Sequence, residues 1–128
     1  MSVKRVMPVV TVDDLDAAVE GYRAVLGLDV VMNHGWIATL SGQDHRHQLS
    51  LMTRDATAPV NPAVSVEVDD VDAAYDAAVQ AGLKIIHPLG DEDWGVRRFF
   101  LRDPAVLLFD EPTAHLPAAL EETVLGNI

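Results

Sequence analysis

The sequence predicts an α+β fold in which two tandem βαβββ modules form a curved mixed sheet around a cavity. The first observation is an internal repeat, because residues 10–18 (VTVDDLDAA) return as residues 66–74 (VEVDDVDAA). The second is that apolar residues with helical spacing follow each copy. The third is that three strand-like runs follow each predicted helix. A repeat of this kind indicates two equivalent supersecondary units that pack against one another.

Each copy of the repeat leads into an amphipathic helix. The first helix carries its apolar residues at i, i+3, i+4 and i+7 spacing, and these are Leu15, Ala18, Val19, Tyr22, Val25 and Leu26. One of the paired aspartates at 13–14 and at 69–70 is expected to cap each helix. Gly27 and Gly82 are expected to end the two helices.

The chain of 128 residues predicts one domain with four parts. Module one spans residues 1–57, a linker spans 55–62, module two spans 63–110 and a C-terminal tail spans 111–128, with a short helix at 118–125. The expected strands are 5–12, 28–33, 36–40 and 48–53, then 63–68, 83–87, 96–102 and 106–109. Pro8 lacks a backbone donor, which favours an edge or bulged position for the first strand. One helix covers only one face of each four-stranded unit, so the other face is free to enclose a ligand.

Composition narrows the classes of function. The chain has no cysteine, which excludes disulfides and thiolate metal sites and is typical of a cytoplasmic protein. No apolar stretch is long enough to span a membrane, and no signal peptide is recognisable. The formal net charge of −11 disfavours nucleic acid as a partner and attracts cationic ligands.

Two motifs resemble the vicinal oxygen chelate superfamily, which includes glyoxalase I, bleomycin-resistance proteins, fosfomycin-resistance enzymes and extradiol dioxygenases. One is the repeat leading into a helix that ends YRAVLGL at 22–28, and the other is WGVRRFFLRDP at 94–104. The resemblance covers about residues 4 to 104. It implies the fold described above, a homodimer, and a small molecule held in the cavity.

The resemblance also implies a divalent metal ion held by His, Glu or Gln on the first and last strands of the modules. The corresponding positions here hold Met7 and Ala63, and Asp110 is the single candidate ligand. A thioether and a methyl group do not suit a hard divalent ion. We therefore expect no metal site and no other cofactor.

Six residues are expected to line the ligand site: Trp36, Met52, His87, Trp94, Arg98 and Phe100. Arg98 and Phe100 share one face of their strand because side chains alternate. Arg98 then either binds an anionic group of the ligand or pairs with a local acid. The tryptophans either stack on a planar ligand or pack at a rim. Phe100 either lines the cavity or belongs to the core, and His87 either faces the cavity or meets water at a strand end.

The leading hypothesis is a metal-independent binding protein of the glyoxalase/bleomycin-resistance type that holds an apolar or cationic aromatic ligand. The bleomycin-resistance members sequester a cationic drug without catalysis, which the resemblance and the acidic charge together favour here. The alternatives are a metal-dependent lyase or dioxygenase of the same superfamily, and a non-catalytic structural or regulatory dimer. No catalytic residue is predicted.

Overall fold

The computed structural model describes residues 1–112 and contains the two predicted βαβββ modules. Module one holds β1 (Val3–Thr11), α1 (Leu15–Leu26), β2 (Asp29–Asn33), β3 (Ile37–Ser41) and β4 (Gln48–Met52). Module two holds β5 (Val64–Val68), α2 (Val71–Gln80), β6 (Lys84–Asp91), β7 (Val96–Arg102) and β8 (Val106–Pro112). The predicted fold class is confirmed.

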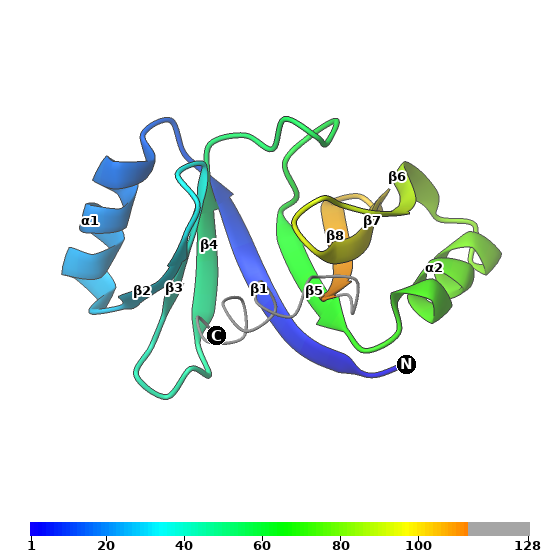
Figure 1. Ribbon diagram of the computed structural model, residues 1–128, viewed down its shortest axis with the longest axis horizontal. Helices are drawn as coiled ribbons and strands as arrows, with labels where there is room; N and C mark the ends of the chain where they lie inside the picture. The colour runs from blue at the N-terminus through cyan, green and yellow to red at the C-terminus, as the bar shows by residue number, and fades with distance from the viewer. Residues whose placement is uncertain (113–128) are drawn as a thin grey trace.

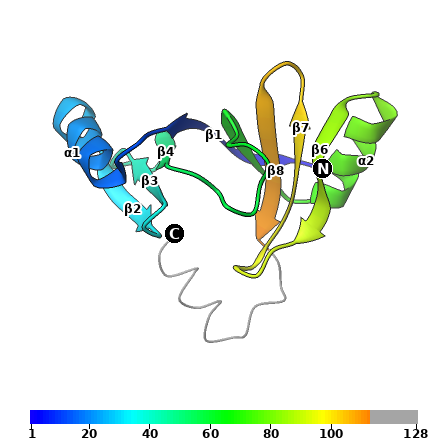
Figure 2. The same cartoon turned by 90° about the horizontal axis from the view of Figure 1, so that it is seen from above.

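All eight strands belong to one mixed sheet in the order β2-β3-β4-β1-β5-β8-β7-β6. Within the modules, β1 pairs with β4 and β5 pairs with β8 in parallel, and the remaining pairs are antiparallel. The antiparallel pair of β1 and β5 joins the modules at the centre of the sheet. Figure 1 shows α1 and α2 at opposite ends, and Figure 2 shows the sheet curving between them. We call the sheet face that turns away from both helices the concave face.

Each helix packs part of its apolar side against its own half of the sheet, while Val25 and Leu26 of α1 and Val79 of α2 are exposed. The buried cluster under α1 consists of Leu15, Val19, Ala38, Leu40 and Leu51. The cluster under α2 consists of Val66, Val68, Val71, Ala74, Ala78, Phe99 and Leu101. Removing this apolar area from water is the main source of stability for each module.

The two helices begin in the same way. Asp14 and Asp70 are the N-caps, and their carboxylates accept from the backbone N–H of Ala17 and Ala73 at 3.1 and 3.0 Å. The first helix ends at Gly27, whose φ of +65° is the left-handed conformation that glycine adopts without strain. The second ends at Gln80, before Gly82.

Of the two alternatives that Pro8 favoured, the edge strand was wrong, because β1 lies in the middle of the sheet, while the irregularity of β1 lies away from Pro8. The strand pairs with β5 up to Pro8 and with β4 from Val9 onward, and its one register shift lies at Val3/Arg5. Val9 donates to Ala63 on the β5 side, so the Pro8 nitrogen points to the other side, just before the pairing with β4 begins. The missing donor therefore falls where no strand pair uses it.

Two other strands are longer than predicted. β6 continues through Pro88 to Asp91, with register shifts on both sides of His87, and β8 runs three residues beyond Phe109 to Pro112. The helix expected at 118–125 lies outside the described residues. Among residues 1–112, neither helix has the length and apolar character needed to cross a membrane.

Candidate functional site

Alternation along the strands divides the side chains of the sheet between the helices and the concave face. Phe99 and Leu101 of β7 and Phe109 of β8 pack under α2. Arg98, Phe100 and Asp110 therefore point to the concave face. This confirms the prediction that Arg98 and Phe100 share a face of their strand.

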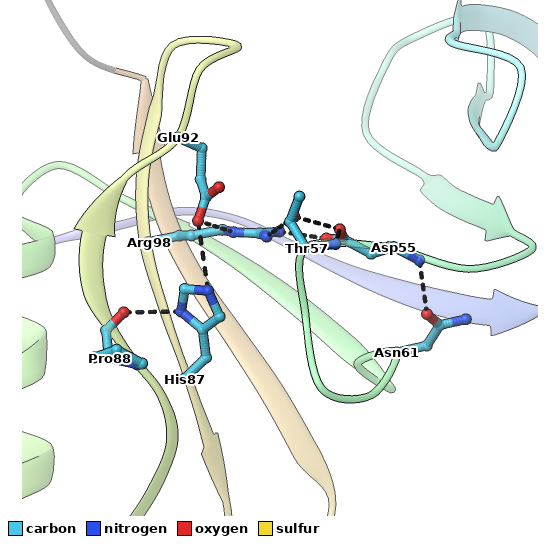
Figure 3. A network of polar contacts seen from close by, with 7 residues as sticks. All are labelled: Asp55, Thr57, Asn61, His87, Pro88, Glu92 and Arg98. Carbon is cyan, nitrogen blue, oxygen red and sulfur yellow. Dashed lines mark hydrogen bonds and ion pairs between the residues drawn. The ribbon is translucent and has the colours of Figure 1, made fainter.

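Arg98 lies at the centre of the polar contacts on the concave face (Figure 3). It is only 3% exposed, and its Nη1 donates to Asp55 Oδ2 at 2.6 Å. Its Nη2 donates to Thr57 Oγ1 at 2.8 Å, and its Nε lies 3.3 Å from Glu92 Oε1. Arg98 thus pairs with two local acids, which is the second of the two interpretations of this residue.

The linker between the modules folds back over the sheet to supply two of these partners. Asp55 Oδ1 accepts from both the backbone N–H and the hydroxyl of Thr57. Asn61 fastens the linker to module one by donating to Thr11 Oγ1 and to the Thr53 carbonyl, both at 3.0 Å. Burial alone would raise the pKa of Asp55, but the hydrogen bonds from Arg98 and Thr57 outweigh it and hold this pKa below its ordinary value.

Aromatic rings surround the Arg98 guanidinium. Its central carbon lies 4.9 Å from the ring centroids of both Trp94 and Phe100, which is a cation–π distance. Trp94 meets Trp36 edge to face at 6.4 Å, and His87 lies 5.2 Å from Phe100. Trp94 is 41% exposed, whereas Phe100 is fully buried. Trp94, with half-buried Trp36 beside it, therefore forms the accessible part of this aromatic group.

His87 joins the same network from β6. Its Nε2 lies 3.5 Å from Glu92 Oε1, and its Nδ1 lies 2.8 Å from the Pro88 carbonyl oxygen (Figure 3). Glu92 thus lies between Arg98 and His87. The imidazole faces this cluster rather than open water, since its side chain is only 15% exposed.

A row of charged side chains crosses the concave face where the modules join. Arg5 on β1 is opposite Glu67 on β5, Glu67 is beside Asp110 on β8, and Asp110 is opposite Arg98 on β7. Arg5 donates to Glu67 Oε1 at 3.1 Å and to Gln48 Oε1 at 2.8 Å. We call Arg5, Glu67, Asp110 and Arg98 the charged row.

Asp110 is the carboxyl of the charged row with an unsatisfied oxygen; the Arg98 Nε also makes no hydrogen bond but lies in an ion pair with Glu92. The Oδ1 of Asp110 is buried and has no hydrogen-bond partner among the described residues. Burial, followed by the negative charge of Glu67, raises the pKa of this carboxyl from 3.8 to about 7. Arg5 and Arg98 act in the opposite direction without restoring the ordinary pKa. Near neutral pH this group can hold or release a proton.

Apart from Arg5 on β1, the concave-face residues of module one described next, on β1, β3 and β4, are uncharged. Thr39 Oγ1 and Ser50 Oγ are 2.8 Å apart, and Ser50 also donates to Met7 Sδ at 3.4 Å. Met52 is 2% exposed and is the cross-strand partner of Ile37, which follows Trp36 in the chain. Hydroxyl and thioether groups on this side satisfy one another.

The positions expected to hold a metal ion can be located through the strand pairing. Val10 pairs with Leu51 in module one as Val66 pairs with Phe109 in module two, so Met52 corresponds to Asp110. The positions that the resemblance associates with a metal ion thus hold Met7 on β1 and Ala63 before β5, with Met52 and Asp110 as the equivalent pair on β4 and β8, and these side chains do not fit a hard divalent ion. Within residues 1–112, no three His, Asp or Glu side chains lie close enough together to hold a metal.

The structure brings five of the six predicted ligand-site residues into one connected group: Trp36, Trp94, Arg98, Phe100 and His87. Met52 on β4 takes no part in these ring and cation–π contacts and is the cross-strand partner of Ile37. Asp55, Thr57, Glu92 and the Arg5–Glu67 pair were not predicted. Alternation from Arg98 and Asp110 could have indicated Glu67, but nothing local to the linker indicates that Asp55 reaches β7.

Two shallow surface hollows lie away from this group. One is formed at the end of α1 and the start of β2 by Glu20, Arg23, Ala24, Gly27, Leu28 and Asp29. The other follows the edge strand β2 from Val30 to His34. Neither contains a residue of the concave face discussed above, and both are open to solvent.

Comparison with known proteins agrees with this architecture. The sequence model of the Glyoxalase/Bleomycin resistance protein/Dioxygenase superfamily matches residues 3–110. A comparison with curated proteins gives no match.

Three solved structures illustrate the similarity of fold. A Legionella pneumophila protein described as an NAD-dependent benzaldehyde dehydrogenase has a TM-score of 0.71 at 17% identity, covering 85% of this chain and 100% of its own. A superfamily member from Vibrio splendidus 12B01 has a TM-score of 0.64 at 17% identity, covering 87% and 99%. Methylmalonyl-CoA epimerase from Mycobacterium tuberculosis has a TM-score of 0.63 at 20% identity, covering 93% and 91%. At these identities the likeness concerns the fold alone.

Proposed function

The chain belongs to the glyoxalase/bleomycin resistance protein/dioxygenase superfamily, and on this basis we propose that it is a metal-independent protein that binds a cationic aromatic small molecule at its concave face. The observation that carries the proposal is a tryptophan pair, with Trp94 exposed and Trp36 half-buried, beside a group of carboxylates. Trp94 lies against Arg98 and Trp36 meets Trp94 edge to face, and the charge of Arg98 is already compensated by Asp55 and Glu92. Aromatic surface near excess negative charge favours a planar cation.

Metal independence is supported by the donor set. Thioether and methyl groups stand at three of the four positions, and one carboxylate cannot hold a hard cation alone. The binding role therefore depends on shape, ring contacts and charge. The homodimer implied by the family resemblance is part of the proposal, and the molar mass in solution tests it.

Fluorescence titration tests the binding function directly, because Trp36 and Trp94 are the only two tryptophans in the chain. Ethidium is the cationic planar probe, and anilinonaphthalene sulfonate is the anionic control. We expect saturable quenching by ethidium in buffer containing EDTA, and none by the sulfonate. The single-tryptophan variants Trp36→Phe and Trp94→Phe report which ring contacts the probe.

Two outcomes would overturn the proposal. One is the absence of saturable binding by ethidium at any accessible concentration. The other is stoichiometric metal in protein purified without chelator, together with binding that EDTA abolishes. That second result would favour a metal-dependent lyase or dioxygenase of the same superfamily instead.

A further inference from the structure

We infer that the carboxyl group of Asp110 is the acceptor for a protonated amine of the ligand, on the concave face between Glu67 and Arg98. This inference rests on the proposed function and adds the chemistry by which the cation is recognised. It also assigns a role to Asp110 that is unrelated to metal binding.

The first argument is the unmet bonding capacity of Asp110. Its neighbours Phe109 and Leu107 pack under α2, so the side chain of Asp110 points to the concave face. Its Oδ1 is buried and accepts no hydrogen bond within residues 1–112. A buried carboxyl oxygen without a partner is uncommon in a folded protein, and a donor from a ligand would satisfy it.

The second argument is that both nearby arginines are engaged elsewhere. Arg5 donates to Glu67 and Gln48. Arg98 donates to Asp55 and Thr57, and its Nε lies beside Glu92. Asp110 is therefore flanked by cations whose short contacts are made with other groups.

The third argument is the charge balance around the charged row. The two arginines face four carboxyls, which are Glu67, Asp110, Asp55 and Glu92. Glu111 is not part of this balance, because its Oε1 accepts from the Val71 backbone N–H at the start of α2. Burial and the charge of Glu67 raise the pKa of Asp110 to about 7, which shows that its ionised form lacks compensation. A protonated amine would supply the missing positive charge.

The same geometry describes the class of ligand. Trp94 lies against the Arg98 guanidinium, and Asp110 is opposite Arg98 in the pairing of β7 and β8. An aromatic ring contacting Trp94 and an amine reaching Asp110 would therefore occupy two sides of one arginine. The predicted ligand is an aromatic primary or secondary amine, with the amine on a short flexible arm.

A matched pair of probes tests this inference by isothermal titration calorimetry. 2-(1-Naphthyl)ethylamine and 2-(1-naphthyl)ethanol differ only in the ammonium or hydroxyl at the end of the arm. We expect the wild-type protein to bind the amine at least about tenfold more tightly than the alcohol, as one charge-assisted hydrogen bond predicts. In Asp110→Asn this preference should disappear while the affinity for the alcohol stays unchanged.

Glu67→Gln is the matched control, because Glu67 is a neighbouring carboxyl that is already paired with Arg5. It should reduce the preference for the amine by less than Asp110→Asn does. Equal affinities of the two probes for the wild type, or a preference that survives in Asp110→Asn, would overturn this inference and leave aromatic binding in place. Absence of binding by both probes would instead contradict the proposed function. Unfolding curves of each variant establish that it is folded.

Discussion

The two modules share their sequence on the helix side of the sheet and differ on the concave side. The repeat places Val10, Val12 and Leu15 of module one, and Val66, Val68 and Val71 of module two, in equivalent contacts with their helices. The equivalent cross-strand pairs on the concave face differ in chemical character between the two modules. Thr39 and Ser50 correspond to Phe100 and Leu108, and Ile37 and Met52 correspond to Arg98 and Asp110.

The difference shows which positions the fold itself restricts. Residues under a helix must fill a close-packed space, so both modules use similar apolar residues there. Residues on the concave face do not have to pack against a helix, so each module carries different chemistry there. Module two supplies three of the four residues of the charged row and the exposed ring of Trp94, whereas module one supplies Arg5 and, on β3 and β4, a neutral, internally bonded wall.

The largest change in stability that this difference between the modules predicts is a loss in Arg98→Met. The change leaves Asp55 and Glu92 without their cation, and Asp55 is only 4% exposed. Breaking a buried ion pair from one side costs about 3–5 kcal/mol of unfolding free energy. Urea unfolding of the variant and the wild type measures this loss.

Arg97→Met is the matched control for Arg98→Met. Arg97 is the adjacent residue and pairs with Asp72 and Asp91 on the helix side of the sheet, where its side chain is 30% exposed. Its replacement should cost about 1 kcal/mol or less. Adding Asp55→Asn to Arg98→Met should recover part of the loss. Equal costs at positions 97 and 98 would show that the Arg98 network does not stabilise module two.

A smaller effect, of opposite sign, is expected from Asp110→Asn. The pKa of Asp110 is about 7 in the folded protein and near 3.8 in the unfolded chain, so the unfolded state ionises first. Below about pH 4 the carboxyl of Asp110 is protonated in both states and does not lower the free energy of unfolding. As the pH rises from about 4 toward 7, the unfolded state loses this proton first, so the free energy of unfolding of the wild type should fall. Asparagine does not titrate, so the free energy of unfolding of Asp110→Asn, relative to that of the wild type, should rise by a few kcal/mol from about pH 4.5 to pH 8.

Chemical unfolding of both proteins at the two pH values measures this gain. Met52→Leu supplies the control, because Met52 is the module-one counterpart of Asp110 and carries no charge. Its effect on stability should be the same at both pH values. A stability difference between Asp110→Asn and the wild type that is independent of pH would contradict the raised pKa.

The parts of the fold with local signals could be predicted from the sequence. Helix caps at Asp14 and Asp70 and the break at Gly27 depend on residues within one turn of the helix, and the structure confirms them. The opposite faces of Arg98 and Phe99 follow from strand alternation alone. The internal repeat predicted that the two modules would be alike in topology.

The parts that depend on distant pairing could not be predicted. Pro8 indicated an edge or bulged strand, but β1 is central and the change of partner from β5 to β4 beside Pro8 removes the conflict, and no local pattern reports such a change. Asp55 belongs to a segment rich in turn residues, so its contact with Arg98 depends on how the whole linker folds over the sheet. The sequence alone therefore could not decide whether Arg98 binds an anionic group of a ligand or pairs with a local acid.

The smallest effect in the comparison is expected in module one from Thr39→Val. The change removes the 2.8 Å hydrogen bond to Ser50 but leaves the Ser50 hydroxyl beside Met7 Sδ. One neutral hydrogen bond contributes about 1 kcal/mol, and valine fits the space of threonine, so a loss of about 1 kcal/mol is expected in urea unfolding. The loss should not change with pH, because none of these three groups titrates near neutrality.

In Thr39→Val/Ser50→Ala both hydrogen-bonding partners are removed, so the double variant should lose less unfolding free energy than the sum of the losses of the two single variants. A loss as large as that of Arg98→Met would mean that the neutral wall of module one stabilises the concave face as strongly as the charged network of module two.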